Sequence, residues 1–432
     1  MNKKERIKLV PKYRFPEFRN SDSWDRGTLA KLADRVEEKV GENELTTLSI
    51  SAGTGFVSQA EKFSRDISGN QYKNYIHLRK GDFSYNKGNS KTFPQGCIYE
   101  LIEYEEAAVP NAFISFHFKD NYVPYFYKGY FENNFHGKQL TRFITSGARM
   151  DGLLNIKASD FFSIVLPTPT EREEQQKIAD CLSSIDDLIS AEDKKLSALK
   201  DYKKGLMQKL FPAEGRTVPE WRFPEFADCT EWELIPIGKK VDLLSGYAFK
   251  GEEISQNCTG IPLMRGINIT EGWVRHNQDI DRFFCGCLDG LEKYQLQKND
   301  LVIGMDGSKV GKNSALITAD DVGSLLIQRV ARLRAASIAT IKFVFHHINS
   351  SKFHSYVDKI NTSSGIPHIS AAQIQEFKIY FPIEEKEQQK IADCLSSVEE
   401  LITAQTDKIE ALKQHKKGLM QGLFPLIEEV SR

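Results

Sequence analysis

The sequence lacks the features that would place it in a membrane, outside the cell or around a structural metal. No apolar run approaches the roughly 18 residues that a membrane span requires. The positively charged start MNKKERIKLV has no apolar segment behind it, so nothing directs the chain to secretion and we expect it in the cytoplasm. The seven cysteines contain no C-x-x-C pair, which argues against a disulfide framework and a zinc site. Cys285 and Cys287 form a C-x-C, but no second pair or suitably spaced histidine accompanies them, so we expect no bound metal.

A surplus of positive charge, which dedicated nucleic-acid-binding chains usually carry, is also absent. The 432 residues include 58 lysines and arginines against 59 aspartates and glutamates, which gives a net charge of -1. Any binding to DNA must therefore come from local patches. The 40% hydrophobic content is enough for two or three buried cores, so we expect a soluble multidomain protein.

The motifs of DNA-modifying and DNA-translocating enzymes are missing too. A methyltransferase acting on adenine N6 or cytosine N4 needs an Asn/Asp-Pro-Pro-aromatic turn, and the sequence contains no Pro-Pro. The glycines of SAGTGF, Gly53 and Gly55, are better explained by a turn than by a cofactor loop. GSKVGKN resembles a phosphate-binding loop, but Gly307 and Gly311 are one residue too close and Asn313 replaces the Ser/Thr that would bind Mg²⁺. No helicase Asp-Glu box occurs, so we expect a chain without catalytic residues and without a bound cofactor.

What the chain does contain is an internal repeat. Residues 174–212 align with residues 387–425 at a constant offset of 213, with 27 identities in 39 positions, including EQQKIADCLSS and KKGLMQ. The pentapeptide RFPEF occurs at 14–18 and again at 222–226, and each copy precedes a tryptophan by the same interval. The segments between the repeated pieces show little resemblance. We call the repeated pieces the frame and the segments between them the variable regions. Along the chain, frame and variable region alternate twice.

The repeated segment predicts a long helix with a coiled-coil seam. Apolar residues recur at alternating steps of three and four, and polar residues interrupt both copies at the same places. Such a helix of about 40 residues is roughly 60 Å long. Each seam could pack on its own domain, but pairing of the two narrow, equally long seams is favoured. The seam residues are Ile178, Leu182, Ile185, Ile189, Leu196, Leu199 and Leu206 in the first copy, and Ile391, Leu395, Val398, Ile402, Ile409, Leu412 and Leu419 in the second.

Two equivalent halves most simply fold around a pseudo-twofold axis, which makes the two helices antiparallel. Both variable regions are rich in short apolar strands, such as AFISFHF and DLVIGM, broken by Gly and Asn. We therefore predict an α+β fold, in which two mixed α/β domains are separated by two long antiparallel coiled-coil helices with pseudo-twofold symmetry. The predicted boundaries are an N-terminal frame segment at 1–23, a first variable domain at 24–167, a central spacer helix at 168–212, a linker at 213–231, a second variable domain at 232–382, a distal spacer helix at 383–425 and a tail at 426–432.

Candidate DNA-contacting residues lie in polar loops of the variable regions. Neither region is strongly basic, so contacts must concentrate in loops such as YNKGNSK, RGINITEGWVR and NTSSGIPH. Arginine suits guanine O6 and N7, asparagine suits adenine, and the lysine-bearing GSKVGKN turn suits phosphates. Each of these residues could equally be a solvated loop residue. The candidates are Tyr85, Asn86, Lys87, Lys91, Arg149, Lys250, Arg265, Asn268, Arg275, Lys309, Lys312, Ser364 and His368.

Other conspicuous side chains are better explained by packing. The aromatic group YVPYFYKGYF at 122–131 could stack nucleobases, but core packing is favoured. His346 and His347 are expected on a helix as packing or surface residues, because paired metal ligands would need i, i+4 spacing. Cys181 and Cys394 lie at equivalent places beside the seam, where they fit as small apolar fillers.

This arrangement resembles the specificity subunit of type I restriction-modification systems over essentially the whole chain. LPTPTEREEQQKIADCLSSID and FPIEEKEQQKIADCLSSVE are similar to the strand, proline, Glu-Gln and helix sequence that ends each recognition domain of that family. LLSGYAFK, GIPLMRGINITEG and NDLVIGMDGSKVGK are similar to segments of its target-recognition domains. YIHLRKGDFSYNKGNS is similar to another variety seen in the family.

The resemblance implies that each variable region is a target-recognition domain that reads one half of a split double-stranded DNA target. It also implies that the helices set the gap and dock two methyltransferase subunits, through which motor and endonuclease subunits join. S-adenosylmethionine, ATP and Mg²⁺ would then be bound by those partners. Two alternatives stay open: a self-sufficient DNA methyltransferase or nuclease, against which the missing Pro-Pro turn argues, and a scaffold that binds protein but no DNA.

Overall fold

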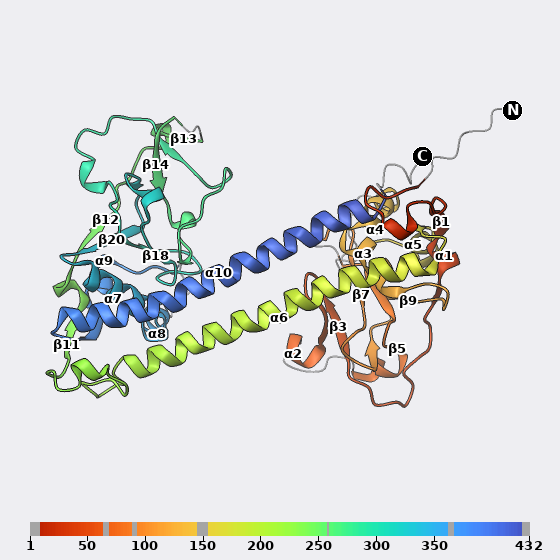
Figure 1. Ribbon diagram of the computed structural model, residues 1–432, viewed down its shortest axis with the longest axis horizontal. Helices are drawn as coiled ribbons and strands as arrows, with labels where there is room; N and C mark the ends of the chain where they lie inside the picture. The colour runs from red at the N-terminus through yellow and green to blue at the C-terminus, as the bar shows by residue number, and fades with distance from the viewer. Residues whose placement is uncertain are drawn as a thin grey trace. The chain divides into compact units, whose positions relative to one another are not determined.

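The computed structural model describes residues 9–63, 69–88, 93–144, 154–256, 259–361 and 367–425. The chain divides into two units: unit 1 comprises residues 1–193 and 407–432, and unit 2 comprises residues 194–406. The chain passes from one unit to the other at two positions, and both lie inside the long helices α6 (Arg172–Leu210) and α10 (Glu385–Leu423) (Figure 1). Each of these 39-residue helices therefore contributes one stretch to each unit.

Unit 1 contains a mixed α/β domain whose largest sheet has four antiparallel strands in the order β2-β9-β6-β7. Two further antiparallel pairs, β3 with β4 and β5 with β8, complete its described strands apart from β1 and β10. The elements are β1 (Asp25–Thr28), α1 (Leu29–Leu32), β2 (Ala33–Arg35), β3 (Leu48–Ser51), β4 (Gly55–Ser58), α2 (Gln59–Phe63), β5 (Ile76–Arg79), β6 (Phe83–Asn86), β7 (Cys97–Glu100), β8 (Glu106–Val109), β9 (Ile114–Phe118), α3 (Pro124–Glu132), α4 (Phe135–Leu140), α5 (Ala158–Phe162) and β10 (Val165–Thr168).

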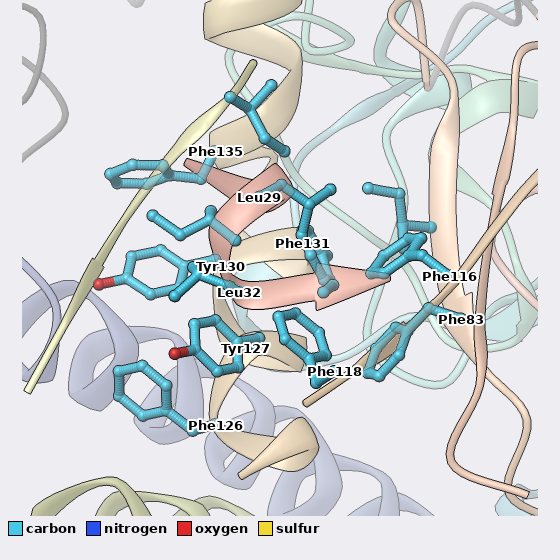
Figure 2. Packing of buried hydrophobic residues seen from close by; sticks show 14 of the residues in the cluster. Leu29, Leu32, Phe83, Phe116, Phe118, Phe126, Tyr127, Tyr130, Phe131 and Phe135 are labelled. Atoms are coloured by element: carbon cyan, nitrogen blue, oxygen red, sulfur yellow. The ribbon is translucent and has the colours of Figure 1, made fainter. Parts of the chain in front are cut away.

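Aromatic rings build the core of unit 1. Figure 2 shows Phe83, Phe116 and Phe118 packed against the side chains of helix α3. Phe118 stacks on Tyr127, with ring centroids 4.2 Å apart and 12° between the ring planes. Such offset pairs add to the stabilisation that burial of the rings provides. The expectation that the aromatic group at 122–131 packs in a core is therefore confirmed.

Unit 2 contains a five-stranded sheet in the order β12-β20-β17-β18-β15 and a smaller sheet in the order β13-β16-β14-β19. The long strand β20 lies between β12 and β17 and runs antiparallel to both, so its start lies beside the ends of its two neighbours. The elements are β11 (Glu233–Pro236), β12 (Val241–Ser245), β13 (Ile254–Ser255), β14 (Ile261–Met264), β15 (Glu271–Gly272), β16 (Phe283–Phe284), β17 (Leu301–Gly304), β18 (Ser314–Leu316), β19 (Leu325–Leu326), β20 (Val330–Ala335), α7 (Ile338–Ile348), α8 (Ser351–Ile360), α9 (Ala371–Glu376) and β21 (Lys378–Phe381).

In each unit a stretch of α6 packs antiparallel to a stretch of α10 (Figure 1). The start of α6 shares the core of unit 1 with the end of α10, and the end of α6 shares the core of unit 2 with the start of α10. The predicted α+β fold with two long antiparallel helices is thus confirmed. Seven of the fourteen seam residues are buried members of these cores, and the half-buried Leu196, Leu199 and Leu419 pack against them. Ile185, Ile189 and Leu412 are also half-buried, outside both cores.

Each variable region begins and ends on one strand pair. In unit 1, β1 pairs antiparallel with β10, from Asp25 opposite Thr168 to Thr28 opposite Val165. In unit 2, β11 pairs with β21 in the same way, from Glu233 opposite Phe381. The two ends of each variable region therefore lie side by side at the start of a long helix.

Candidate nucleic-acid interface

A buried ion pair joins the two repeated motifs in unit 1. Arg14, from the first RFPEF, donates from Nε and Nη2 to the two carboxylate oxygens of Glu174, from the first EQQK, at 2.8 and 2.7 Å. Its guanidinium also donates to the carbonyl oxygens of Ser21 and Asp22, and the indole of Trp24 donates to Glu174 at 3.3 Å. The Arg14 and Glu174 side chains are only 6% and 1% exposed. The Glu174 hydrogen bond is the main reason that the pKa of Arg14 is raised.

The same arrangement recurs in unit 2. Arg222 donates to both oxygens of Glu387 at 2.7 and 2.8 Å, and Trp232 donates to Glu387 at 3.3 Å. The Arg222 guanidinium again donates to two carbonyl oxygens, those of Cys229 and Thr230. Reasoning from the sequence found both motifs but did not pair them. The signal that could have done so is that RFPEF and EQQK always occur together with the tryptophan.

We call the Arg14–Glu174 and Arg222–Glu387 ion pairs, with their tryptophans, the clamps. The glutamine after each clamp glutamate ties the long helix to the variable region. In unit 1, Gln175 donates to the carbonyl oxygen of Pro169 at 3.3 Å and accepts from the backbone N–H of Val123 at 3.1 Å, just before α3. In unit 2, Gln388 donates to Pro382 at 3.0 Å and accepts from the hydroxyl of Thr340 on α7 at 2.8 Å. Helices α3 and α7 thus occupy equivalent positions on the frame, although their sequences differ.

Polar residues of the helix pair also follow the repeat. In unit 1, Lys416 of α10 forms ion pairs with Asp186 of α6 at 2.7 Å and with Glu132 of α3 at 2.6 Å. In unit 2, Lys203 of α6 is paired with Glu399 of α10. Because the lysines and their α6 and α10 partners are each related by the offset of 213, the contacts have the reciprocity expected of a pseudo-twofold arrangement.

Four loops of unit 2 meet at one end of the five-stranded sheet, where β12 and β17 end and β20 begins. Backbone hydrogen bonds join them: Gln328 donates to the carbonyl oxygen of Tyr247 at 2.7 Å, and Met305 donates to that of Arg329 at 2.9 Å. Gly307 donates to the carbonyl oxygen of Pro367 at 3.2 Å. We call the segments 246–250, 305–309, 327–329 and 367–368 the sheet-end cluster. Apart from Ala248, its exposed side chains are Tyr247, Lys250, Ser308, Lys309, Gln328, Arg329 and His368.

Three sequence-predicted residues, Lys250, Lys309 and His368, belong to this cluster. All three are exposed, and Lys309 forms an ion pair with Glu271 at 2.9 Å. Lys312, at the end of the same turn, instead pairs with Asp358 of α8 at 2.9 Å. The cluster combines cationic and hydrogen-bonding side chains on rigidly held loops, which is the chemistry that contacts to base edges and phosphates require.

The loop at 265–276 places its predicted residues differently. Asn268 is 1% exposed and its amide donates to Asp281 at 2.8 Å, so it holds the loop together, and the expectation that it reads a base is wrong. Arg265 is half-buried and donates to the carbonyl oxygen of Ile280 at 2.8 Å. Arg275 is exposed, and its Nε donates to the carbonyl oxygen of Ile267 at 2.9 Å. Only Arg275 among these three is exposed.

In unit 1 the structure corrects another prediction. Tyr85 is fully buried, stacks on Phe161 with centroids 4.6 Å apart, and donates its hydroxyl to the carbonyl oxygen of Gln95 at 2.7 Å. It is a core residue and not a DNA contact. Asn86 is half-buried and accepts from the backbone of Gly88 at 2.9 Å, as in a turn, and Lys87 is half-buried beside it. The remaining candidates, Lys91, Arg149 and Ser364, lie outside the described residues.

The histidines of α7 serve packing, as expected. His347 stacks on Phe211 with centroids 4.0 Å apart, and His346 is fully buried beside Ser396 of α10. Burial lowers the pKa of each histidine to about 3, so both are neutral at pH 7. Across the described ranges, no three His, Cys, Asp or Glu side chains are grouped so that they could hold a metal ion. No described helix is both long and apolar enough to cross a membrane.

Comparison with known proteins agrees with this geometry. Residues 34–201 and 244–414 match the family described as type I restriction modification DNA specificity domain. The chain is 28% identical over 289 residues to the type I restriction enzyme MjaVIII specificity subunit of Methanocaldococcus jannaschii, an alignment that covers 65% of this chain and 66% of that protein. It is 32% identical over 174 residues to the Escherichia coli EcoAI specificity subunit, covering 40% of this chain and 28% of that protein.

The fold itself has a solved counterpart. The crystal structure of the type I restriction-modification S subunit from M. genitalium superposes with a TM-score of 0.60 at 14% identity, and the match covers 97% of this chain and 100% of the other. The family match covers more than half of the chain and occurs twice. The chain therefore belongs to the type I restriction-modification specificity subunit family, with two copies of its DNA specificity domain.

Proposed function

We propose that each variable region contacts one half of a bipartite double-stranded DNA target, so that the chain directs methylation and restriction by a type I complex. The observation that carries this proposal is the contrast between the two parts of the chain. The frame repeats its clamp contacts to within 0.1 Å, whereas the two variable regions have different sheets on that frame. Two different variable regions on one duplicated frame fit a DNA target whose two halves have different sequences.

We further propose that α6 and α10 set the spacing between the half-sites. They contain both positions at which the chain passes between the units. A helix resists bending far more than a loop does, so such a connection keeps a separation that a flexible linker would not. S-adenosylmethionine, ATP and Mg²⁺ belong in this proposal to methyltransferase and motor subunits, and the chain itself is non-catalytic and works with DNA in the cytoplasm.

Docking of two methyltransferase subunits is supported by repeated residues that the fold does not use. Leu188 and Leu401 are equivalent in the repeat, yet their side chains are 43% and 57% exposed. They belong to a row that directly precedes the seam residues and matches in both helices apart from Tyr202 and Lys209, whose counterparts are His415 and Gly422. Its exposed, identical members include Ser184, Leu188 and Ala191 in α6, and Ser397, Leu401 and Ala404 in α10. Selection on the fold alone gives no reason to keep exposed leucines twice.

Within each unit, the antiparallel stretches of α6 and α10 turn their rows to the same side of the pair. Each row lies about 100° round its helix from the seam, and the two helices are antiparallel, so their rows face the same way. Asp186, on the opposite flank, bonds the hydroxyl of Tyr125 in the variable region at 2.5 Å. In unit 1 the row is therefore turned away from the variable region.

Two helical glycines support the same surface. Gly205 in α6 and Gly418 in α10 are equivalent, and a Cβ added at either would meet no atom within 4 Å. Glycine inside a helix costs about 0.5–1 kcal/mol relative to alanine, and the contacts of this chain give no reason for it. Close approach of a partner backbone, repeated once per unit, would explain both.

The docking test uses Leu188→Asp, Leu401→Asp and the double variant, mixed with the cognate methyltransferase subunit and weighed by native mass spectrometry. We expect two methyltransferase subunits per wild-type chain, one for each single variant and none for the double variant. The matched control is Ser197→Glu, an exposed position whose counterpart is already Glu410. Retention of two subunits by the double variant would contradict the docking surface.

The DNA proposal is tested by base-resolution sequencing of methylated DNA from cells that express the chain with its methyltransferase. We expect a split, asymmetric motif that disappears when the chain is deleted. Exchange of residues 24–167 for another variable region should change one half-site only. Methylation that is unchanged by deletion would leave a scaffold that binds protein but no DNA, and label transfer from S-adenosylmethionine by the isolated chain would indicate a methyltransferase.

A further inference from the structure

A strained arginine lies at the centre of the sheet-end cluster. Gln328 and Arg329 form a two-residue turn between Ile327, which follows β19, and Val330, which begins β20, and the backbone of Arg329 has a φ of +67°. Two other non-glycine residues in the described ranges have positive φ, and both are asparagines, Asn134 and Asn299. Asparagine tolerates this conformation, whereas arginine is strained in it.

The strain is imposed by the strands around the turn. Gln328 donates its N–H to Tyr247 at 2.7 Å, the carbonyl oxygen of Arg329 accepts from Met305 at 2.9 Å, and Val330 closes the turn onto Ile327 at 3.3 Å. Because three segments fix the backbone, the conformation does not depend on the side chain at 329. Glycine would satisfy it without strain, so the fold does not explain an arginine there.

The guanidinium of Arg329 is bonded to the protein through one nitrogen, and most of the side chain is exposed to solvent. Its Nη1 donates to Oδ2 of Asp306 at 2.9 Å, and its side chain is 66% exposed, against 27% for Asp306. Asp306 is itself fixed, because it pairs through its backbone with His368. A guanidinium has five N–H donors in a rigid fork, so one bond to a carboxylate restricts its orientation and leaves donors for a second partner.

We propose that Arg329, oriented by Asp306, reads a guanine in the half-site contacted by unit 2, and that Gln328 contacts the groove beside it. Two parallel donors match O6 and N7 of guanine in the major groove, and a planar group already fixed by an acid loses less freedom on binding. This inference rests on the proposed DNA-reading function. It assigns the role of specificity determinant to Arg329 and that of positioning residue to Asp306.

The test compares Arg329→Ala, Arg329→Lys and Asp306→Asn in the full chain with its methyltransferase, read by the same methylation sequencing. We expect Arg329→Ala to lose roughly 10- to 100-fold of its preference at one G·C position of one half-site, since a bidentate pair is worth about that factor. Arg329→Lys should lose part of that preference, because an ammonium can donate to O6 and N7 but lacks the planar fork that Asp306 orients. Asp306→Asn should lose part of it. The matched control is Lys298→Ala, which removes an exposed cation elsewhere in unit 2.

Arg329→Gly provides a readout that a structural role would not predict. It relieves the positive φ, so unit 2 should melt at a higher temperature while the preference at that base is lost. Several outcomes would overturn the inference: a unit 2 half-site without a G·C pair, Arg329→Lys behaving as wild type, or Arg329→Ala weakening methylation equally at all sites, as loss of a phosphate contact would. If exchange of residues 232–382 changes that half-site while the Arg329 variants do not, only this inference fails; if chain deletion leaves methylation unchanged, the proposed function fails with it.

Discussion

The clamp between Arg14 and Glu174 gives a prediction whose size follows from its burial. Both side chains are almost fully buried, and the carboxylate accepts from Arg14 twice and from Trp24 once. Glu174→Ala leaves the guanidinium buried without its counter-charge. Removal of one partner of a buried ion pair costs about 3–5 kcal/mol, more than the lost attraction alone, because the remaining charge is desolvated.

The expected loss is local to unit 1. Hydrogen exchange with mass spectrometry should show that amides of β1 and β10 exchange at least roughly 100-fold faster in Glu174→Ala, since each 1.4 kcal/mol is a factor of ten in an opening equilibrium. Protection of β11 and β21 should be unchanged. Glu387→Ala should give the reverse pattern, because its clamp has the same geometry in unit 2.

Two controls separate the ion pair from general damage. Glu173→Ala removes an exposed carboxylate one residue away and should change the exchange of β1 by less than a factor of about two. Replacing both clamp partners, Arg14→Met with Glu174→Met, should cost less than Glu174→Ala alone, since no unpaired charge stays buried. If Glu174→Ala costs less than about 1 kcal/mol, or if the double replacement costs more than the single one, the reasoning is wrong.

Three further predictions concern packing and pH, each measured by thermal or urea unfolding. Gly129→Ala should destabilise unit 1 by about 1–3 kcal/mol, because its Cβ would lie 2.6 Å from the ring of Phe424, whereas Gly418→Ala meets no atom and should stabilise its helix by about 0.5–1 kcal/mol. Burial raises the pKa of Glu100 to about 7, so unit 1 loses stability as pH rises from about 4.5 to 7, and Glu100→Gln should melt above wild type at pH 8 but not at pH 4. Burial lowers the pKa of His347 to about 3, so unit 2 loses stability as pH falls from about 6.5 to 3, and His347→Phe should reduce that loss. A Glu100→Gln shift in melting temperature that is equal at pH 4 and pH 8 would contradict the first pH prediction. A His347→Phe variant that loses as much stability on acidification as wild type would contradict the second.

The long helices could be predicted from the sequence because their evidence is periodic and occurs twice. Alternating steps of three and four define the seam, and the repeat of polar interruptions fixes its register. The clamp could not be derived in the same way. Arg14 and Glu174 are 160 residues apart, and no local pattern links an arginine just before a short 3₁₀ helix to a glutamate in a long α-helix.

The candidate site was harder because exposure depends on the other strands. Tyr85 was chosen for its polar neighbours, but it lies on β6 in the middle of a sheet whose rings bury it. Arg329 was missed because the sequence IQRV contains no Gly, Asn or Pro to indicate a turn. Its turn exists because β12 and β17 hold the backbone on both sides, which only the tertiary structure reveals.

The equivalence of α3 and α7 shows how little the frame demands of the sequence that it carries. Phe126 and Phe343 each pack against the frame tryptophan, at 5.6 and 5.8 Å between centroids, and four residues later Tyr130 and His347 each meet a frame phenylalanine. An acquired coding segment therefore has to supply a strand at each end and one helix with two correctly spaced rings. Outside the residues that contact the frame or fill the domain's own core, such a segment can diverge, so its loops can change without disturbing the frame.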